Sequence, residues 1–260
     1  MPRLHFIQQG QGPTVVLSHA LGCDLSMWDG VAEALQDHFT VFRYDHRGHG
    51  RSAAGDSDGA GAFSIDDLAD DAAELIASQG LGVVHFAGLS LGGMTAQALG
   101  ARHPQLLRSL VIANSASHYD TVAQALWQAR IDTVQAQGLS AISQGAMQRW
   151  FTPEFRDPAD PGSHCVSALR SVLESTAQQP YAQACAAVKN IALDAGNRRI
   201  LCPTLVIAGS RDEATPPAMS EAIAKSIPGA RLRSLAAAHL SAVEQPEAFA
   251  ALLTDFWRSL

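Results

Sequence analysis

Short apolar runs alternate with longer segments of helical spacing over most of the chain. Most of the runs are apolar throughout or nearly so, which is typical of parallel strands covered on both faces, whereas 4–8 alternates weakly. Helical segments stand between them, so the pattern predicts an α/β fold around a largely parallel sheet. The predicted strands are 4–8, 14–18, 40–44, 83–87, 109–113, 204–208 and 231–235.

The segments between these strands carry apolar residues at helical spacing. Residues 28–38 have this spacing, and Ser64 is a suitable N-cap for a helix to about Gln79. Aspartates near the start of that helix suit the positive end of its dipole. Further helices are predicted directly after Ser90, at 217–227 and at 246–257.

The alternation stops between His118 and Asn197. Helical segments at 122–138, 140–150, 163–178 and 181–193 follow one another there without a convincing strand. The sheet pattern then resumes at Thr204. We therefore expect a core formed by residues 1–117 and 198–260, with residues 118–197 inserted as a helical cap.

A glycine-flanked serine follows the strand at 83–87. The segment Gly88-Leu89-Ser90-Leu91-Gly92 leads into a run of helix formers. Strand, G-x-S-x-G and helix is the context of a nucleophile elbow, in which glycines leave room for a tight turn. The bare pattern arises by chance in roughly one chain in ten of this length. A glycine-rich turn with an incidental serine is the alternative interpretation. Catalytic partners for Ser90 elsewhere in the chain would distinguish the two.

Candidate partners occur in the order that an elbow serine requires. Asp212 follows the strand at 204–208, and His239 follows the strand at 231–235. His239 is the only one of the ten histidines after Asp212, so it is the predicted general base. Each residue alone is more often an ordinary loop side chain. Together with Ser90 they predict a catalytic triad, for which Glu213 and Asp194 are the alternative acids.

Backbone N–H groups for an oxyanion hole come from two loops. Leu91 follows the nucleophile, and the loop after strand 14–18 offers Leu21. We expect His19 to brace that loop and to have no catalytic role. The histidines and glycines of 45–50 suggest a metal site, but no second ligand cluster appears, so a structural turn is the better interpretation. Asn114, at another possible acid position, is not an acid.

Composition and charge indicate which binding partners and which cellular compartment to expect. The net charge of −7 disfavours nucleic acid and anionic membrane surfaces, and it means that an anionic substrate needs a local basic group. The four cysteines form no C-x-x-C, so we expect reduced thiols. No apolar run matches a signal peptide or the roughly 18 residues of a membrane span. These features predict a cytoplasmic protein.

The motifs resemble the α/β-hydrolase superfamily over essentially the whole chain. The resemblance implies a mostly parallel sheet of seven to eight strands, flanked by helices and carrying a helical cap insertion. Within the superfamily the chain is most similar to 3-oxoadipate enol-lactonases, although His19 stands where these enzymes more often have a small polar residue. The stretches that carry this similarity are 21–29, 43–50, 88–94, 127–131, 149–155, 181–187 and 237–241.

The resemblance implies hydrolysis of a carboxylated enol-lactone to 3-oxoadipate in the degradation of aromatic compounds. Ser90 attacks the lactone carbonyl, His239 moves the protons and an acyl-enzyme forms, without a metal or cofactor. A serine at position 90 argues against haloalkane dehalogenases and epoxide hydrolases, whose nucleophile is Asp. The alternatives are a broader carboxylesterase or perhydrolase-like enzyme and, from another class, a non-enzymatic small-molecule receptor.

An anionic substrate needs a cation in the cap. Arg130 is the first candidate, because helical spacing sets it beside Trp127 in a family-like segment. Arg149 next to Trp150 is the alternative, and we count Trp150 as a substrate contact. The alternative is that these arginines are ordinary solvated helix residues, which is the usual case at a surface. Tryptophans in a cap more often belong to its core than contact a substrate.

Overall fold

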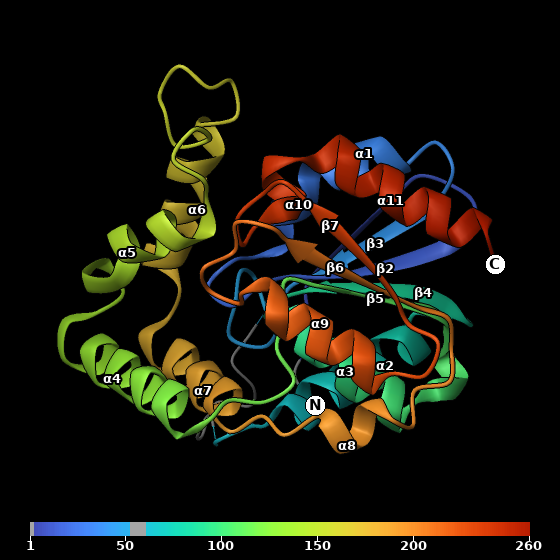
Figure 1. Cartoon of the computed structure of the whole chain (residues 1–260), viewed down its shortest axis with the longest axis horizontal. Helices are drawn as coiled ribbons and strands as arrows, with labels where there is room; N and C mark the ends of the chain where they lie inside the picture. Colours follow the sequence, from blue (N-terminus) through green and yellow to red (C-terminus); the bar gives the residue numbers. More distant parts are fainter. Residues whose placement is uncertain (1–2, 53–60) are drawn as a thin grey trace.

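A seven-stranded sheet forms the centre of the computed structural model, which describes residues 3–52 and 61–260 (Figure 1). The strand order is β1-β3-β2-β4-β5-β6-β7, and every neighbouring pair is parallel except β1 with β3. This confirms the predicted α/β sheet and puts β4 at its middle. The strands are β1 (Phe6–Gln9), β2 (Thr14–Ser18), β3 (Thr40–Tyr44), β4 (Val84–Leu89), β5 (Leu107–Ala113), β6 (Thr204–Gly209) and β7 (Arg231–Leu235).

Helices cover both faces of this sheet, so β4 and β6 are buried throughout and β2 is buried except at Thr14. One face carries α1 and α11, which pack against each other, and the other carries α2, α3, α8 and α9 (Figure 1). Two 3₁₀ turns, Leu25–Trp28 and Pro104–Leu106, complete the connections. The helices are α1 (Asp29–Leu35), α2 (Ile65–Ser78), α3 (Leu91–Arg102), α8 (Asp194–Asn197), α9 (Pro217–Ser226) and α11 (Pro246–Arg258).

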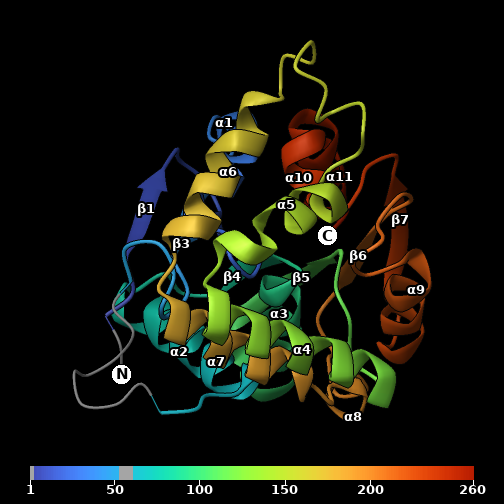
Figure 2. The same ribbon diagram turned by 90° about the vertical axis from the view of Figure 1, so that its left-hand side faces the viewer.

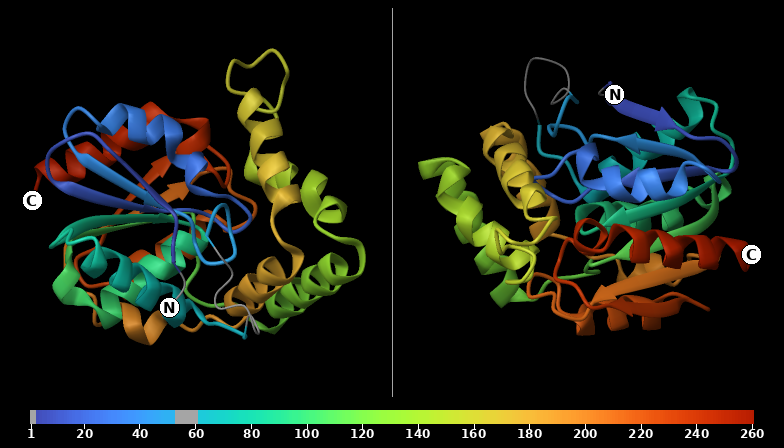
Figure 3. Two further views of the ribbon diagram at one scale, coloured as in Figure 1. Left: turned by 180° about the vertical axis from the view of Figure 1, so that it is seen from behind. Right: turned by 90° about the horizontal axis from the view of Figure 1, so that it is seen from above.

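Four helices between β5 and β6 stand apart from the sheet, and we call them the four-helix layer. They are α4 (Thr121–Gln137), α5 (Ser140–Trp150), α6 (His164–Ser175) and α7 (Gln178–Lys189). Figures 2 and 3 show them gathered at one end of the sheet. A β-bridge between His118 and Ala192 brings the two ends of this segment together. The division of the chain at 118–197 stays a prediction.

Helix ends follow local chemistry and differ from the predicted bounds in several places. Ser64 caps α2 in a reciprocal box, since its side chain accepts from the Asp67 N–H while Asp67 accepts from the Ser64 N–H. The helix predicted at 163–178 ends at Ser175, because the backbone of Thr176 is extended. The helix predicted at 181–193 begins at Gln178 and ends at Lys189. A short helix after His239, α10 (Ser241–Glu244), was not predicted.

Candidate active site

Ser90 sits on a strained turn between β4 and α3. Its φ of 58° lies in the left-handed region, where non-glycine residues are uncommon. A Cβ on Gly88 would overlap the carbonyl oxygen of Gly92, and a Cβ on Gly92 would overlap that of Ser18. The glycines therefore give the turn the space that the elbow pattern predicts. This geometry puts Ser90 at the carboxyl end of the central strand.

Ser90, His239 and Asp212 form one chain of hydrogen bonds between buried side chains. Ser90 Oγ lies 3.0 Å from His239 Nε2, and His239 Nδ1 lies 2.9 Å from Asp212 Oδ2. Because a carboxylate only accepts, Nδ1 carries the proton, and Nε2 is free to accept from the serine hydroxyl. The arrangement can therefore take a proton from Ser90 and stabilise the imidazolium that results.

The Asp212 carboxylate is held by five donors. Oδ1 accepts from the backbone N–H groups of Ala214 and Thr215, at 2.8 and 2.9 Å. Oδ2 accepts from His239, from the Thr215 hydroxyl at 2.8 Å and from Asn114 Nδ2 at 3.0 Å. Burial alone would raise the pKa of Asp212, but the charge of His239 and these hydrogen bonds outweigh it, so the pKa lies below its usual value.

The two alternative acids lie elsewhere. Glu213 is exposed and, among the described residues, forms no hydrogen bond or ion pair with His239, although it lines the neighbouring cavity. Asp194, the first residue of α8, pairs with His118 at 3.0 Å. Of the three carboxylates considered, Asp212 is therefore the one that is hydrogen-bonded to His239.

Three polar side chains of this network were given no role from the sequence, although Asn114 was considered and excluded as an acid. Asn114 follows β5, Thr215 follows Asp212 by three residues, and Ser241 donates to Asn114 Oδ1 at 2.6 Å. The one signal available was that Asn114 stands where a parallel strand ends, at the functional edge of such a sheet.

The two predicted oxyanion donors have no competing acceptor. Leu91 is the first residue of α3, where N–H groups lack an intrahelical partner. Within the described residues, neither its N–H nor that of Leu21 donates a hydrogen bond. Leu21 also lines the same cavity as His239. These contacts are compatible with the oxyanion hole, which remains a proposal.

His19 ties the oxyanion loop, residues 19–22, to its neighbours. Its Nδ1 lies 2.8 Å from the carbonyl oxygen of Ala20, and its Nε2 accepts from the backbone N–H of His46 at 2.9 Å. Its own carbonyl accepts from the Gly92 N–H at 3.1 Å. Both ring nitrogens are thus occupied, as expected for a bracing residue.

Asp45 organises the loop at 45–52 as a structural turn. Its carboxylate accepts from the backbone N–H groups of Leu25 and Arg51 at 2.8 Å each, and it pairs with His5 at 2.9 Å. Across the described ranges 3–52 and 61–260, no group of three or more His, Cys, Asp or Glu side chains is arranged to hold a metal ion.

A cavity of about 500 Å³ opens beside His239. Both cap arginines, Arg130 and Arg149, line it, as does Trp150. The Arg130 guanidinium lies 5.0 Å from the ring centre of Trp127. Within the part of the chain that the structure describes, neither arginine forms an ion pair. Burial and the charge of Arg130 lower the pKa of Arg149, which marks this side of the cavity as cationic.

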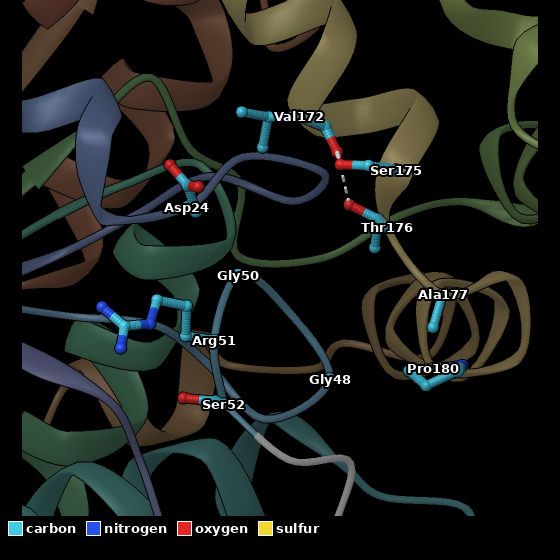
Figure 4. Close-up of a pocket in the computed structure, with 10 residues that line it drawn as sticks. All are labelled: Asp24, Gly48, Gly50, Arg51, Ser52, Val172, Ser175, Thr176, Ala177 and Pro180. Atoms are coloured by element: carbon cyan, nitrogen blue, oxygen red, sulfur yellow. Dashed lines mark hydrogen bonds between the residues drawn. The ribbon is translucent and has the colours of Figure 1, made fainter.

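A second cavity, of about 350 Å³, lies where the loop at 48–52 faces the start of α7 (Figure 4). Asp24 and Arg51 come to it from the core, and Thr176 and Pro180 from the helical layer. It contains none of the predicted site residues, so the cavity beside His239 is the candidate active site.

None of the described helices is both long and apolar enough to cross a bilayer.

Comparisons with known proteins agree on the hydrolase fold. The profile of the family described as "alpha/beta hydrolase fold" matches residues 13–246. The chain is 36% identical to 3-oxoadipate enol-lactonase 2 of Acinetobacter baylyi over 241 residues, which are 93% of this chain and 87% of that protein. It is 31% identical to a candidate carbamate hydrolase, RutD, of Serratia proteamaculans, with 93% and 89% covered. The crystal structure of the enol-lactonase from Burkholderia xenovorans LB400 superposes with a TM-score of 0.92 at 33% identity, covering 99% and 97%.

Proposed function

This chain belongs to the α/β-hydrolase family, and we propose that it hydrolyses 3-oxoadipate enol-lactone to 3-oxoadipate. The substrate is a five-membered enol-lactone that bears a carboxymethyl group. The observation that carries the proposal is the pair of arginines without ion-pair partners among the described residues, beside the Ser90–His239–Asp212 chain. The relatives named as enol-lactonases support the same substrate.

The first half of the reaction opens the ring. His239 takes the Ser90 proton as Oγ attacks the lactone carbonyl, and the N–H groups of Leu21 and Leu91 stabilise the oxyanion. The C–O bond of the ring then breaks, and the enolate that leaves takes the proton from His239. Because an enol converts readily to its ketone, the acyl-enzyme carries the 3-oxo group.

The second half releases the product. A water molecule gives a proton to His239 and attacks the acyl carbonyl, and the same N–H groups hold the second oxyanion. The Ser90–acyl bond breaks, Ser90 recovers its proton from His239, and the new carboxylic acid loses its remaining proton to solvent and leaves as a carboxylate. Both halves use groups of this chain alone.

The substrate carboxylate needs a cation at one end of the cavity. Arg130 is our first choice, because the Trp127 ring fixes its guanidinium, whose charge also lowers the pKa of Arg149 in the same cavity. Arg149 is the alternative, and Trp150 supplies an apolar wall beside it. A planar guanidinium suits a carboxylate because it can donate two parallel hydrogen bonds.

A broader acyl hydrolase, such as a carboxylesterase or perhydrolase-like enzyme, is the second candidate. The relative named as a candidate carbamate hydrolase supports it, since carbamates and esters can share acyl-enzyme chemistry. This candidate predicts fast turnover of uncharged aryl esters or carbamates and indifference to the lactone.

A steady-state assay on the purified protein distinguishes these candidates. We expect turnover of the enol-lactone, with short aryl esters and a small carbamate hydrolysed far more slowly. The Ser90→Ala variant should lose at least about 10⁴-fold in kcat, because the nucleophile is removed. Labelling of wild-type protein, but not of Ser90→Ala, by a serine-reactive phosphonate excludes a non-enzymatic receptor. Turnover of neutral esters without turnover of the lactone would refute the proposal.

A further inference from the structure

Asn114 is fully buried directly behind the acid of the proposed triad. Its Nδ2 lies 3.0 Å from Asp212 Oδ2 and 3.2 Å from the carbonyl oxygen of Ala238. Its Oδ1 accepts from the Ser241 hydroxyl at 2.6 Å. The side-chain amide therefore has partners on both its donor side and its acceptor side.

The chemistry of these partners decides which way the amide points. A carboxylate and a carbonyl can only accept, so the NH₂ group must face Asp212 and Ala238. Ala238 directly precedes His239 in the chain. One amide group thus joins the loop of the acid to the loop of the base.

The local backbone is shaped to allow this contact. Asn114 has a φ of 47°, in the left-handed region that asparagine tolerates better than most residues. A Cβ on Gly209 would lie 2.7 Å from Asn114 Nδ2, so the glycine leaves room for the amide. The Asn114 N–H also donates to the carbonyl oxygen of Ile207 at 2.9 Å, which anchors the residue to β6.

We propose that Asn114 is a positioning residue, which holds Asp212 against His239 and moderates the basicity of the carboxylate. The inference rests on the proposed function of the Ser90–His239–Asp212 chain. Three donors share Asp212 Oδ2, namely those of His239, Thr215 and Asn114. Donors that share one acceptor weaken one another, so the Asn114 amide limits how strongly Asp212 binds the imidazolium.

Removal of the amide has a defined direction. Without the Asn114 donor, the Asp212 carboxylate is more basic and holds the protonated form of His239 more strongly. Activity needs the neutral histidine, so the acidic limb of the kcat/KM profile moves to higher pH. We expect a shift of about 0.5 to 1 pH unit, which corresponds to one net hydrogen bond.

The test uses the Asn114→Ala variant of the full chain. We expect kcat at the pH optimum to fall about tenfold while KM changes by less than about twofold, because the loops of Asp212 and His239 lose their shared anchor while no contact to the substrate is lost. The proton shared by His239 Nδ1 and Asp212 Oδ2 gives a second readout by NMR. Its resonance should move downfield, because the bond to Asp212 strengthens.

The NMR signal does not depend on turnover, so it separates two kinds of failure. Wild-type protein without Ser90-dependent hydrolysis would refute the proposed function alone. A buried asparagine that forms no hydrogen bond with Ser90, His239 or Asp212, Asn197, is the matched control; it is hydrogen-bonded to Gln97 and Ser226. Asn197→Ala should lower Tm but move neither the acidic limb nor the NMR signal. If Asn114→Ala behaves in the same way, the residue is merely structural and the inference is wrong.

The isosteric variant Asn114→Asp covers the case in which Asn114→Ala does not fold. It keeps an acceptor for Ser241 but sets a second carboxyl about 3 Å from Asp212. Two carboxyls at this distance share one proton, so the pH profile should gain an ionisation that wild-type protein lacks. A profile identical to that of wild type overturns the inference.

Discussion

Three buried histidines, His19 in the oxyanion loop and its neighbours His46 and His49, take no part in the proposed chemistry. The rings of His46 and His49 lie 4.6 and 5.4 Å from that of His19, between centroids. His46 Nδ1 and His49 Nε2 have no hydrogen-bond partner among the described residues. Burial lowers the pKa of all three, and burial together with the charge of His19 lowers that of His49 to about 3. The folded protein therefore keeps these rings neutral.

Acid should destabilise the protein through this cluster. A histidine with a depressed pKa binds its proton in the unfolded chain first, so its stabilising contribution is complete above about pH 6.5 and is lost as the pH falls toward 3. In this range each such residue lowers the free energy of unfolding by about 1.4 kcal/mol per pH unit. His49→Phe keeps a ring and removes one titrating group, so urea denaturation should give it a shallower pH dependence. The exposed His38 is the control, and His38→Asn should match wild type. Parallel curves for His49→Phe and wild type would contradict this account.

Chain order and strand ends predict Ser90, Asp212 and His239, because an elbow serine constrains where its partners stand. They do not predict Asn114, whose contact with Asp212 spans 98 residues of sequence. From the sequence, Asn114 could only be excluded as an acid. Its hydrogen-bonding role depends on the side-by-side pairing of β5 and β6, which periodicity does not reveal.

At the level of the elements, the turn at Ser90 depends on the close approach of β2 to the start of α3. The Gly92 N–H donates to the His19 carbonyl oxygen at 3.1 Å, and a Cβ on Gly92 would overlap the Ser18 carbonyl oxygen. Because the opposing atoms belong to the backbone of the central sheet, neither β2 nor α3 can shift to make room without a large cost in stability.

Gly92→Ala should therefore destabilise the protein by at least about 3 kcal/mol, measured by urea denaturation, or prevent folding. Gly145→Ala in α5 is the control. The nearest atom to its new Cβ is Arg149 Nη1 at 3.4 Å, the end of a flexible side chain. Alanine in a helix interior should stabilise by up to about 1 kcal/mol. A Gly92→Ala protein as stable as wild type would refute the steric argument.

Strand positions were easier to predict than helix ends. The central strands are buried on both faces, so their apolar runs mark them with little ambiguity. Helices of the cap end where the backbone changes locally, as at Thr176, and propensity places such points only to within a few residues. The short helix α10 after His239 is set by tertiary contacts, including the hydrogen bond from the Leu240 N–H to the Trp150 carbonyl oxygen.

At the scale of the molecule, the four-helix layer is joined to the loop of the proposed base. Besides the bond between Leu240 and Trp150, the Thr152 N–H and hydroxyl donate to the Glu244 carboxylate at 2.9 and 3.0 Å. These contacts position Trp150 and its neighbour Arg149 relative to His239. Sequence patterns could predict a cap and candidate arginines, but only the folded chain shows which of them line the cavity.

The charge distribution of the whole molecule bears on the choice of substrate. The chain carries a net charge of −7, yet two arginines without ion-pair partners among the described residues line the cavity beside Ser90 and His239. A local cationic site in an acidic protein favours an anionic substrate over a neutral one of the same shape. We therefore expect the cationic site, more than the Ser90–His239–Asp212 chain, to set the choice of substrate.

The most direct test compares kcat/KM for the carboxylated enol-lactone with that for its neutral methyl ester. Wild-type protein should prefer the carboxylate, and Arg130→Ala should raise its KM by about 10- to 100-fold while the neutral analogue changes little. Arg149→Ala is measured in parallel, and the larger selective loss identifies the carboxylate ligand. An equal loss on both substrates in both variants would contradict the proposal that the cavity arginines bind the substrate carboxylate. A wild-type preference for the neutral analogue would contradict it too.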